Sequence, residues 1–470
     1  MSEKKKLSRR QFLAGAATAA AGTVLLSACA PPEPEVVVET VKETVEVEVE
    51  KEVEVEVEKV VTATPPPAEP VTIVFWQNNA GWEDMWTEVS ELFVAENPEV
   101  KFEMVEIPGT DWTQSLLASF VAGTEPDSLW MNSDPMLDLQ IKYQPWLPLQ
   151  DYVETGLFEA YDMMAQGAID SMTFGEDLVG LPGSNAIILM FYRTDWMEAV
   201  GWGTEKPKDF AEWAELATKM TYEDPNGTGK DDTYGFVFFG TLARNYCATQ
   251  LRYLMAAARE EHVKPGELNF NTEVGIEVLK FIQDCIHTYK CSPPDTSTYG
   301  HAELYRDVEA GIAGSGRCGT WNIFNWNTWM GEENWVISEY PPLVAGTKPY
   351  SIGDYAAVCA SRNTKNPDWA AKYCAHLLTK EAQELYFQKA GDTYRNDLDL
   401  AALGASETHQ YVYNEMAPTL DYIFFVRDKN WAAEEKEILS RHVQACILDP
   451  NADPAAELAA AEQEIMEVWP

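Results

Sequence analysis

Strand and helix signals alternate from residue 71 onward, and this alternation most restricts the folds open to the chain. Residues 71–75 (VTIVF) alternate and are apolar, which predicts a strand, and apolar residues then recur at helical spacing over 82–93. A second strand (100–107, VKFEMVEI), a second helix (112–123, ending at a glycine) and a third strand (127–134, DSLWMNSD, ending at a loop that carries Asp134) follow. This order predicts an α/β domain with a parallel sheet.

Later segments repeat the same style. Apolar spacing predicts helices over 210–220 and 276–286, the second opened by FNTE, and Pro367 stands at the first position of a further helix. The segment TYGFVFFG (233–240) predicts a strand between them. Two α/β lobes are the simplest interpretation. Because open α/β sheets bind ligands beyond the carboxyl ends of their strands, Asn78 and Asp134 lie where a ligand is expected.

The first 28 residues predict an export signal rather than part of the fold. A basic head containing Arg9 and Arg10 (SRRQFL) precedes a short apolar run, as in twin-arginine signals, and the run is too short to span a membrane. Residues 26–29 (LSAC) resemble a lipobox, which predicts cleavage before Cys29 and acylation of its thiol. The alternative is that Cys29 is an ordinary small residue in a cleaved signal peptide.

Residues 29–70 predict an extended tether between the lipid and the folded body. Valine and glutamate alternate there between proline-rich ends, and repeated negative charge keeps such a chain solvated and extended. A lone β-strand is the alternative, and self-association of the Val/Glu repeat stays open.

The amino-acid composition limits the kinds of partner that this protein can bind. The formal net charge is −42, which disfavours nucleic acid and anionic lipid surfaces, and 46% hydrophobic residues are enough for real cores. Seven cysteines remain after Cys29 without C-x-x-C or zinc spacing, so buried thiols are expected, with a Cys285–Cys291 bridge as an open alternative. The sequence contains no G-x-S-x-G, H-E-x-x-H or Walker motif.

Two glycine-rich segments resemble known ligand-binding motifs. GSGRCG (314–319) matches the dinucleotide pattern G-x-G-x-x-G, but the residues before it have helical composition, so nucleotide binding is not expected. The loop DPNGTGKDD resembles an EF-hand calcium loop and predicts one structural Ca²⁺. Its predicted ligands are Asp224, Asn226, Thr228, Lys230 (through its carbonyl) and Asp232. Gly235 replaces the bidentate glutamate, and a polar turn is the alternative.

Several segments in order resemble the extracellular solute-binding proteins of sugar-type ABC importers, the family that includes maltose-binding protein. They include VTIVFWQN, LLASFVAGTEPDSLWMNSD, DLVGLPGSNAIILMFYRTDWMEAVGW, VEAGIAGSGRCGTWNI and TKNPDWAAKYCAHLLTKEAQELYFQKAG. The resemblance implies a two-lobe, periplasmic-binding-protein-like fold of type II, with a hinge and a ligand cleft between lobes. The implied lobes are 71–183 with 351–395, and 184–350 with 396–470.

The resemblance also implies a ligand set at matching positions. This set comprises Trp76, Gln77, Asn78, Ser133, Asp134, Tyr192, Trp321, Asn322, Gly353, Asp354 and Arg395. The resemblance implies that Trp321 is the ring on which the sugar stacks, because many members of the family carry the sequence sGsW in this loop. Arg395 follows GDTY, which lacks the proline that members commonly carry.

These features together predict a non-enzymatic, monomeric, lipid-anchored binder at the outer face of the cell membrane. It captures a mono- or oligosaccharide and delivers it to an ABC permease. The alternatives are a binder of peptide, polyamine or glycerol phosphate, a ligand sensor for a membrane receptor, and a surface glycosidase. Pyranose faces pack on aromatic rings while ring hydroxyls need a few placed polar groups, which the implied set offers.

Overall fold

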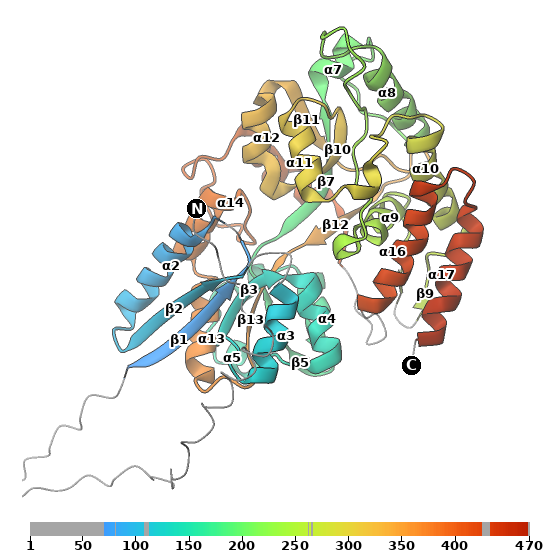
Figure 1. Cartoon of the computed structure of the whole chain (residues 1–470). Helices are drawn as coiled ribbons and strands as arrows, with labels where there is room; N and C mark the ends of the chain where they lie inside the picture. The colour runs from blue at the N-terminus through green and yellow to red at the C-terminus, as the bar shows by residue number, and fades with distance from the viewer. Residues whose placement is uncertain are drawn as a thin grey trace, which may run out of the picture. The chain divides into compact units, whose positions relative to one another are not determined.

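The computed structural model describes residues 70–79, 81–107, 112–261, 263–264, 267–424 and 433–468 (Figure 1). The export signal, Cys29 and the tether lie outside these residues. Two separate hydrophobic cores divide the described chain into a first and a second lobe. Both lobes combine helices with a sheet, so the predicted α/β class is confirmed.

The first lobe is built on a five-stranded sheet. Its strands, in spatial order, are β2 (Val100–Glu106), β1 (Val71–Gln77), β3 (Ser128–Asn132), β13 (Ala356–Ala360) and β6 (Leu181–Pro182). β1 pairs in parallel with β2 and β3, as the sequence predicts, whereas β13 runs antiparallel to β3 and β6. The sheet is therefore mixed rather than wholly parallel.

Helices cover this sheet and bury an aromatic core. The lobe contains α2 (Glu83–Glu96), α3 (Trp112–Ala122), α4 (Ser133–Tyr143), α5 (Gln150–Glu154), α6 (Gln166–Ser171), α13 (Pro367–His376), α14 (Lys380–Ala390) and the hairpin β4 (Thr173–Phe174) and β5 (Asp177–Leu178). Trp130 packs against Trp86 and Tyr386 at ring distances of 4.8 and 4.6 Å. Gly123 directly follows the end of α3, and its φ of 65° is one that glycine adopts readily.

The second lobe is built around β7 (Ala186–Arg193), whose first seven residues are buried. Its neighbours are β10 (Ser315–Gly319), β11 (Trp335–Ser338) and β12 (Tyr350–Asp354), all antiparallel to β7, and β14 (Asp421–Ile423), parallel to β12. The sheet therefore runs β10-β7-β12-β14, with β11 also on β7.

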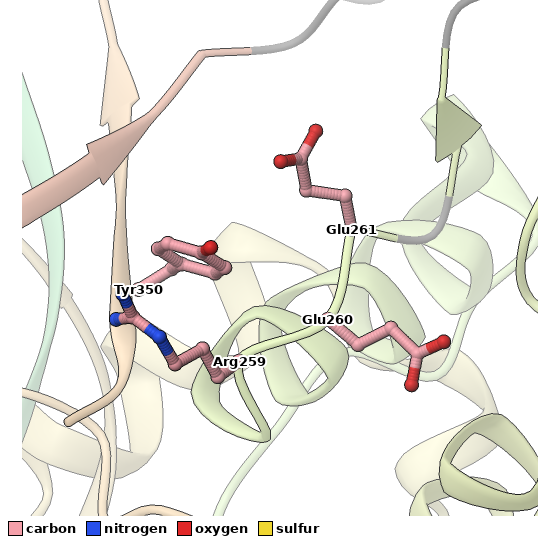
Figure 2. A pocket seen from close by; sticks show the side chains of 4 residues that line it. All are labelled: Arg259, Glu260, Glu261 and Tyr350. Atoms are coloured by element: carbon pink, nitrogen blue, oxygen red, sulfur yellow. The ribbon is translucent and has the colours of Figure 1, made fainter. Parts of the chain in front are cut away.

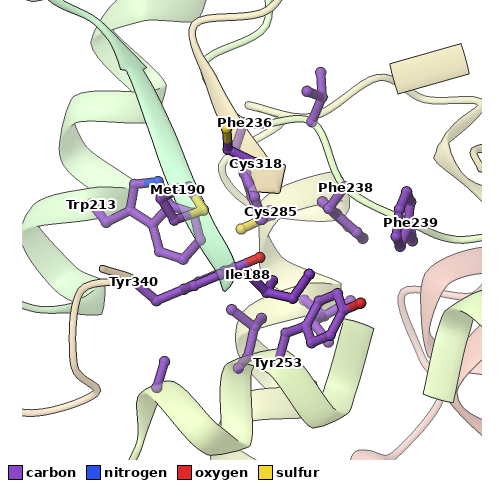
Figure 3. Packing of buried hydrophobic residues seen from close by; sticks show 14 of the residues in the cluster. Ile188, Met190, Trp213, Phe236, Phe238, Phe239, Tyr253, Cys285, Cys318 and Tyr340 are labelled. Carbon is purple, nitrogen blue, oxygen red and sulfur yellow. The ribbon is translucent and has the colours of Figure 1, made fainter. Parts of the chain in front are cut away.

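Helices enclose that sheet in a core rich in aromatic residues (Figure 3). They are α7 (Thr194–Ala199), α8 (Phe210–Tyr222), α9 (Tyr246–Ala257), α10 (Glu273–His287), α11 (His301–Glu309), α12 (Ile323–Met330), α15 (Glu407–Tyr411), α16 (Ala433–Leu448) and α17 (Pro454–Val468), with the hairpin β8 (Val263–Lys264) and β9 (Glu267–Leu268). Thr272 caps α10, since its hydroxyl accepts from Gly275 N at 3.0 Å.

The strand expected at TYGFVFFG does not form. The segment makes only two isolated bridges, Tyr234 to Ala313 and Val237 to Gly316. Phe236 N donates instead to the carbonyl of Cys291 at 3.0 Å, which interrupts the ladder. Buried apolar residues alone do not make a strand when the backbone groups find other partners.

Within the ranges that the structure describes, the chain passes between the lobes three times. It leaves the first sheet after β6 and enters the second at β7, returns between β12 and β13, and crosses again between Tyr394 and Val412, which belong to different cores. Because β12 pairs with β7, residues 351–354 belong to the second lobe. The expected return at residue 351 is therefore corrected to the end of β12.

The C-terminal helices α16 and α17 pack side by side on the second lobe (Figure 1). Lys436 of α16 also reaches the first lobe, where its Nζ lies 2.9 Å from Oδ2 of Asp138 on α4. Both side chains are largely buried. Among the described helices, none has both the length and the apolar character that a membrane crossing requires.

All seven cysteines after Cys29 are buried and free, so the expectation of buried thiols is confirmed. Cys285 and Cys291 are neighbours, with Cys291 N donating to the carbonyl of Cys285 at 2.9 Å, but they are not bonded through sulfur.

Candidate functional site

Amide side chains gather at the carboxyl ends of β1 and β3. Asn78 Nδ2 donates to Oδ1 of Asn132 at 2.8 Å, which joins the ends of the two strands. Gln77 is 2% exposed, and its Oε1 accepts from Asn79 N at 2.6 Å. The parallel pairing of β1 with β3 brings these residues together, as expected at this edge of such a sheet.

A carboxyl pair borders these amides. Gln77 Nε2 donates to Glu106 Oε2 at 3.4 Å, and the Glu83 carboxyl beside Glu106 raises the pKa of Glu106.

Trp76, one residue before Gln77 on β1, is partly buried against the first-lobe core. Its ring therefore packs on the first lobe.

The ends of β3 and β12 meet through Tyr355, at the second crossing between lobes. Ser133 N donates to the Tyr355 carbonyl at 3.2 Å, and Tyr355 N donates to Asp354 Oδ1 at 2.9 Å. Asp134 is the second residue of α4, and its side chain lies outside the described set. Gly353 leaves room for Phe424, because a Cβ there would lie 2.3 Å from that ring.

Trp321 follows β10 on the second lobe, and a hydrogen-bond chain fixes its ring. The indole Nε1 donates to the hydroxyl of Tyr305 at 3.0 Å, and that hydroxyl also lies 3.2 Å from Nδ1 of His301. The ring lies over Gly319, where a Cβ would come within 2.3 Å of it. The glycine of GTW, Gly319, is thus required by the close approach of the indole.

Asn322 has a structural role in the same turn. It is 1% exposed, and its Oδ1 accepts from Gly319 N at 3.0 Å. Thr320 Oγ1 similarly accepts from Ile187 N of β7 at 3.3 Å. The Asn322 bond closes the turn that carries Trp321, and the Thr320 bond ties that turn to the central strand, so Asn322 positions the turn rather than presenting its amide oxygen outward.

Arg317 of β10 is the main residue that the sequence interpretation missed. Its guanidinium carbon lies 4.9 Å from the centroid of the Trp321 ring, and the side chain is 2% exposed. Burial raises the pKa of Asp354, and the nearby guanidinium groups of Arg317 and Arg252 oppose that rise. Arg317 therefore links Trp321 electrostatically with the inter-lobe crossing.

Tyr192 does not occupy a ligand position. It is 1% exposed in the second-lobe core, opposite Ser315 of β10 and Val336 of β11. Burial raises the pKa of its hydroxyl, which has no hydrogen-bond partner among the described residues. Tyr192 packs among the apolar residues of the second-lobe core, so the expectation for Tyr192 is corrected to core packing.

Arg395 is also committed to the protein itself. Its Nε and Nη2 each donate to an oxygen of Asp397 at 2.8 Å, and its Nη1 donates to Glu159 and to the Leu378 carbonyl at 3.1 Å. These bonds engage all three guanidinium nitrogens. The predicted ligand role of Arg395 is therefore replaced by a structural one.

Oxygen atoms of the calcium-like loop converge without forming a cluster of three acidic groups. Thr228 Oγ1 lies 3.1 Å from both Asp232 Oδ1 and Asn226 Oδ1, and Asn226 Nδ2 donates to Asp232 Oδ1 at 2.9 Å. Asp224 uses Oδ2 to accept from Gly229 N at 3.0 Å. Within the described ranges, no group of three or more His, Cys, Asp or Glu is arranged to hold a metal.

A surface pocket of about 340 Å³ lies elsewhere on the second lobe (Figure 2). It is lined by Arg259, Glu260, Glu261 and Tyr350. Arg259 is already paired with Asp421 at 2.8 Å and stacked on Tyr350 at 4.4 Å. Since none of the expected ligand residues lines this pocket, it is not the candidate site.

Comparison with known proteins agrees with this architecture. Residues 76–384, more than half of the chain, match the model of the bacterial extracellular solute-binding protein family. A lactose-binding protein of Rhizobium radiobacter is 29% identical over 143 residues, which cover 30% of this chain and 32% of the relative. The chain thus matches only about a third of that relative's length.

Solved structures cover much more of the chain. An ABC transporter solute-binding protein of Thermotoga lettingae with bound α-D-tagatose has a TM-score of 0.72 at 17% identity, covering 85% of this chain and 100% of that chain. The maltose-bound MalE3 of T. maritima has a TM-score of 0.71 at 19% identity, with the same coverage. The predicted two-lobe, type II periplasmic-binding-protein fold is confirmed. The chain belongs to the bacterial extracellular solute-binding proteins.

Proposed function

We propose that this protein captures a mono- or oligosaccharide between its lobes and delivers it to an ABC importer. The relatives described above are named for lactose or hold tagatose or maltose, which supports a saccharide as the solute class. The protein acts as a monomeric binder and leaves its ligand chemically unchanged.

The arrangement around Trp321 is the single observation that carries this proposal. Its indole is held by Tyr305 next to Arg317, and Arg317 in turn acts on Asp354 at the inter-lobe crossing. A fixed aromatic ring with a few placed polar groups suits a sugar, whose C–H face packs on the ring while its hydroxyls form hydrogen bonds. The Asn78–Asn132 amide pair supplies further polar groups from the first lobe.

The crossings seen in the described part of the chain act as a short hinge about which the two lobes rotate. In this proposal the solute favours the closed arrangement because it contacts both lobes, and the permease recognises that arrangement. Attachment through acylated Cys29 would keep the binder at the outer face of the membrane, with residues 30–70 as its tether.

A thermal-shift screen of the mature protein, followed by calorimetric titration, tests the proposed ligand class. The panel contains neutral and acidic mono- and oligosaccharides, and tri-alanine, spermidine and glycerol 3-phosphate represent the competing classes. We expect at least one saccharide to raise the melting temperature in a concentration-dependent way. Binding of only a non-saccharide compound would replace the proposal, and a saccharide that is hydrolysed during incubation would show an enzyme instead.

We further propose that the loop 224–232 holds one structural Ca²⁺. The ligands would be side-chain oxygens of Asp224, Asn226, Thr228 and Asp232 and the carbonyl of Lys230. The donor atoms fit in kind, because hard oxygen ligands converge around Thr228. A bound ion would cross-link this turn and stabilise the segment that follows α8.

A further inference from the structure

Arg317 is a buried cation with unsatisfied hydrogen-bond donors. The residue is 2% exposed, and its Nε and Nη1 atoms have no hydrogen-bond partner among the described residues. Arg395, by contrast, is 8% exposed and forms bonds through all three nitrogens. Burying an unpaired guanidinium is costly. A ligand that accepts hydrogen bonds from Arg317 would explain why an arginine is buried at this position.

The contacts that Arg317 does make favour a ligand with an acceptor group. Its guanidinium carbon lies 4.9, 5.2 and 5.5 Å from the ring centroids of Trp321, Phe239 and Tyr253. Figure 3 shows Phe239 and Tyr253 within the packed core of the second lobe. Aromatic faces stabilise the positive charge but accept no in-plane hydrogen bonds, so the N–H groups still require an acceptor.

The charges near Arg317 are mainly positive, although the whole chain carries −42. Arg252 and Arg244 both act on the same carboxylate, Asp354, as does Arg317. Burial lowers the pKa of His301, and Arg317 and Arg244 lower that pKa further. Three arginines around one aspartate thus leave an excess of positive charge beside Trp321.

On these grounds, and resting on the proposed saccharide function, we infer that Arg317 binds a carboxylate of the solute and that the solute is an acidic saccharide containing a uronic acid. A guanidinium can pair with a carboxylate through two parallel N–H···O bonds, and a uronic acid is the saccharide unit that carries a carboxylate. The uronic acid ring would stack on Trp321, directly beside the guanidinium.

The first experiment uses the wild-type protein and requires no mutation. Trigalacturonate and tri-glucuronate are titrated by calorimetry in parallel with their fully methyl-esterified forms, which keep the sugar ring but lose the charge. We expect at least one acid to bind more tightly than its ester by about 10- to 150-fold, since hydrogen bonds to charged groups are worth about 1.5–3 kcal/mol. Its affinity should fall as salt is raised, whereas that of the ester should change little.

The second experiment assigns the effect to Arg317. Arg317→Met keeps an unbranched apolar stem against the aromatic rings but removes the charge. It should reduce acid affinity by about 10- to 150-fold and leave ester affinity within about threefold. The matched control is Arg259→Met, an arginine also stacked on a tyrosine but located at the surface pocket, and it should leave both affinities unchanged.

The outcomes separate this inference from the proposed function. Tighter binding of esters or other neutral saccharides than of acids would overturn the acidic-solute assignment and leave the saccharide function standing. No binding of any saccharide in either experiment would overturn both. If Arg317→Met fails to fold, the acid–ester comparison and its salt dependence in the wild-type protein still decide whether the solute is acidic.

Discussion

Replacing Trp321 and Trp213 separately by alanine distinguishes a ligand-binding ring from a core ring in the same lobe. Trp213 is completely buried, and its ring centroid lies 4.3 Å from that of Phe236 and 5.3 Å from that of Phe281. Its Nε1 also donates to Ser315 Oγ at 3.2 Å. Trp213→Ala should therefore reduce the free energy of unfolding by about 3–5 kcal/mol through the cavity, with about 1 kcal/mol more from the lost hydrogen bond.

Trp321 makes fewer contacts that its removal would destroy. Trp321→Ala loses one hydrogen bond to Tyr305, worth about 1 kcal/mol, and one contact with Arg317, worth about 0.5–2 kcal/mol. The stability loss should therefore be about 1–3 kcal/mol. Solute affinity should fall much more clearly, by about 5- to 150-fold, if stacking on the indole contributes about 1–3 kcal/mol as it does for bases.

Urea unfolding and calorimetric titration of both variants provide the two readouts. We expect Trp213→Ala to lose stability while its folded fraction binds solute normally, and Trp321→Ala to show the reverse. The reasoning fails if Trp321→Ala binds the best saccharide as tightly as the wild-type protein while losing as much stability as Trp213→Ala. Trp321 would then be a core residue.

Three further changes test other parts of the molecule. Burial raises the pKa of Asp392 to about 6, so this carboxyl binds a proton more readily in the folded protein than in the unfolded protein. The free energy of unfolding should therefore fall by up to about 3 kcal/mol as the pH rises from about 4 to 6. Asp392→Asn should flatten that part of the stability curve in urea unfolding at several pH values; an unchanged slope would contradict it. A calcium chelator should lower the melting temperature of the wild-type protein and of an Asp231→Asn control but not of Asp232→Asn, and an equal response of all three would argue against the calcium site. Cys29→Ala should release the protein from membranes in cell fractionation, whereas a variant that stays anchored with a normal mature mass would refute acylation there.

The local elements were predictable because their signals lie in neighbouring residues. The alternation of Ile73 and Phe75 predicted β1, and both are completely buried in the structure. The insertion of β13 between β3 and β6 was not predictable, because nothing in the pattern of residues 356–360 indicates which distant strands they pair with. The return of the chain to the first lobe was misplaced for the same reason.

Site residues were predictable where the local sequence determines the turn that carries them. They were not predictable where packing against distant residues determines their surroundings. Trp321 was identified because it follows a glycine-rich strand end, and the indole indeed lies over Gly319. Tyr192 and Arg395 were misassigned because their burial and pairing depend on residues far away in the chain. Arg317 could have been noticed as a lone charge within a strand of small residues, SGRCG, which is otherwise an unusual place for arginine.

The strand order of the first lobe has a consequence for synthesis on the ribosome. β3 is complete at residue 132, but its neighbour β13 begins only at residue 356, after most of the second lobe has been translated. Until then the edge of β3 has no partner on that side, although it carries the apolar segment Leu129–Met131. An unpaired apolar edge invites pairing with other nascent chains. Fragments that stop between β6 and β13 should therefore aggregate, and the newly made chain depends on protection of this edge until β13 emerges.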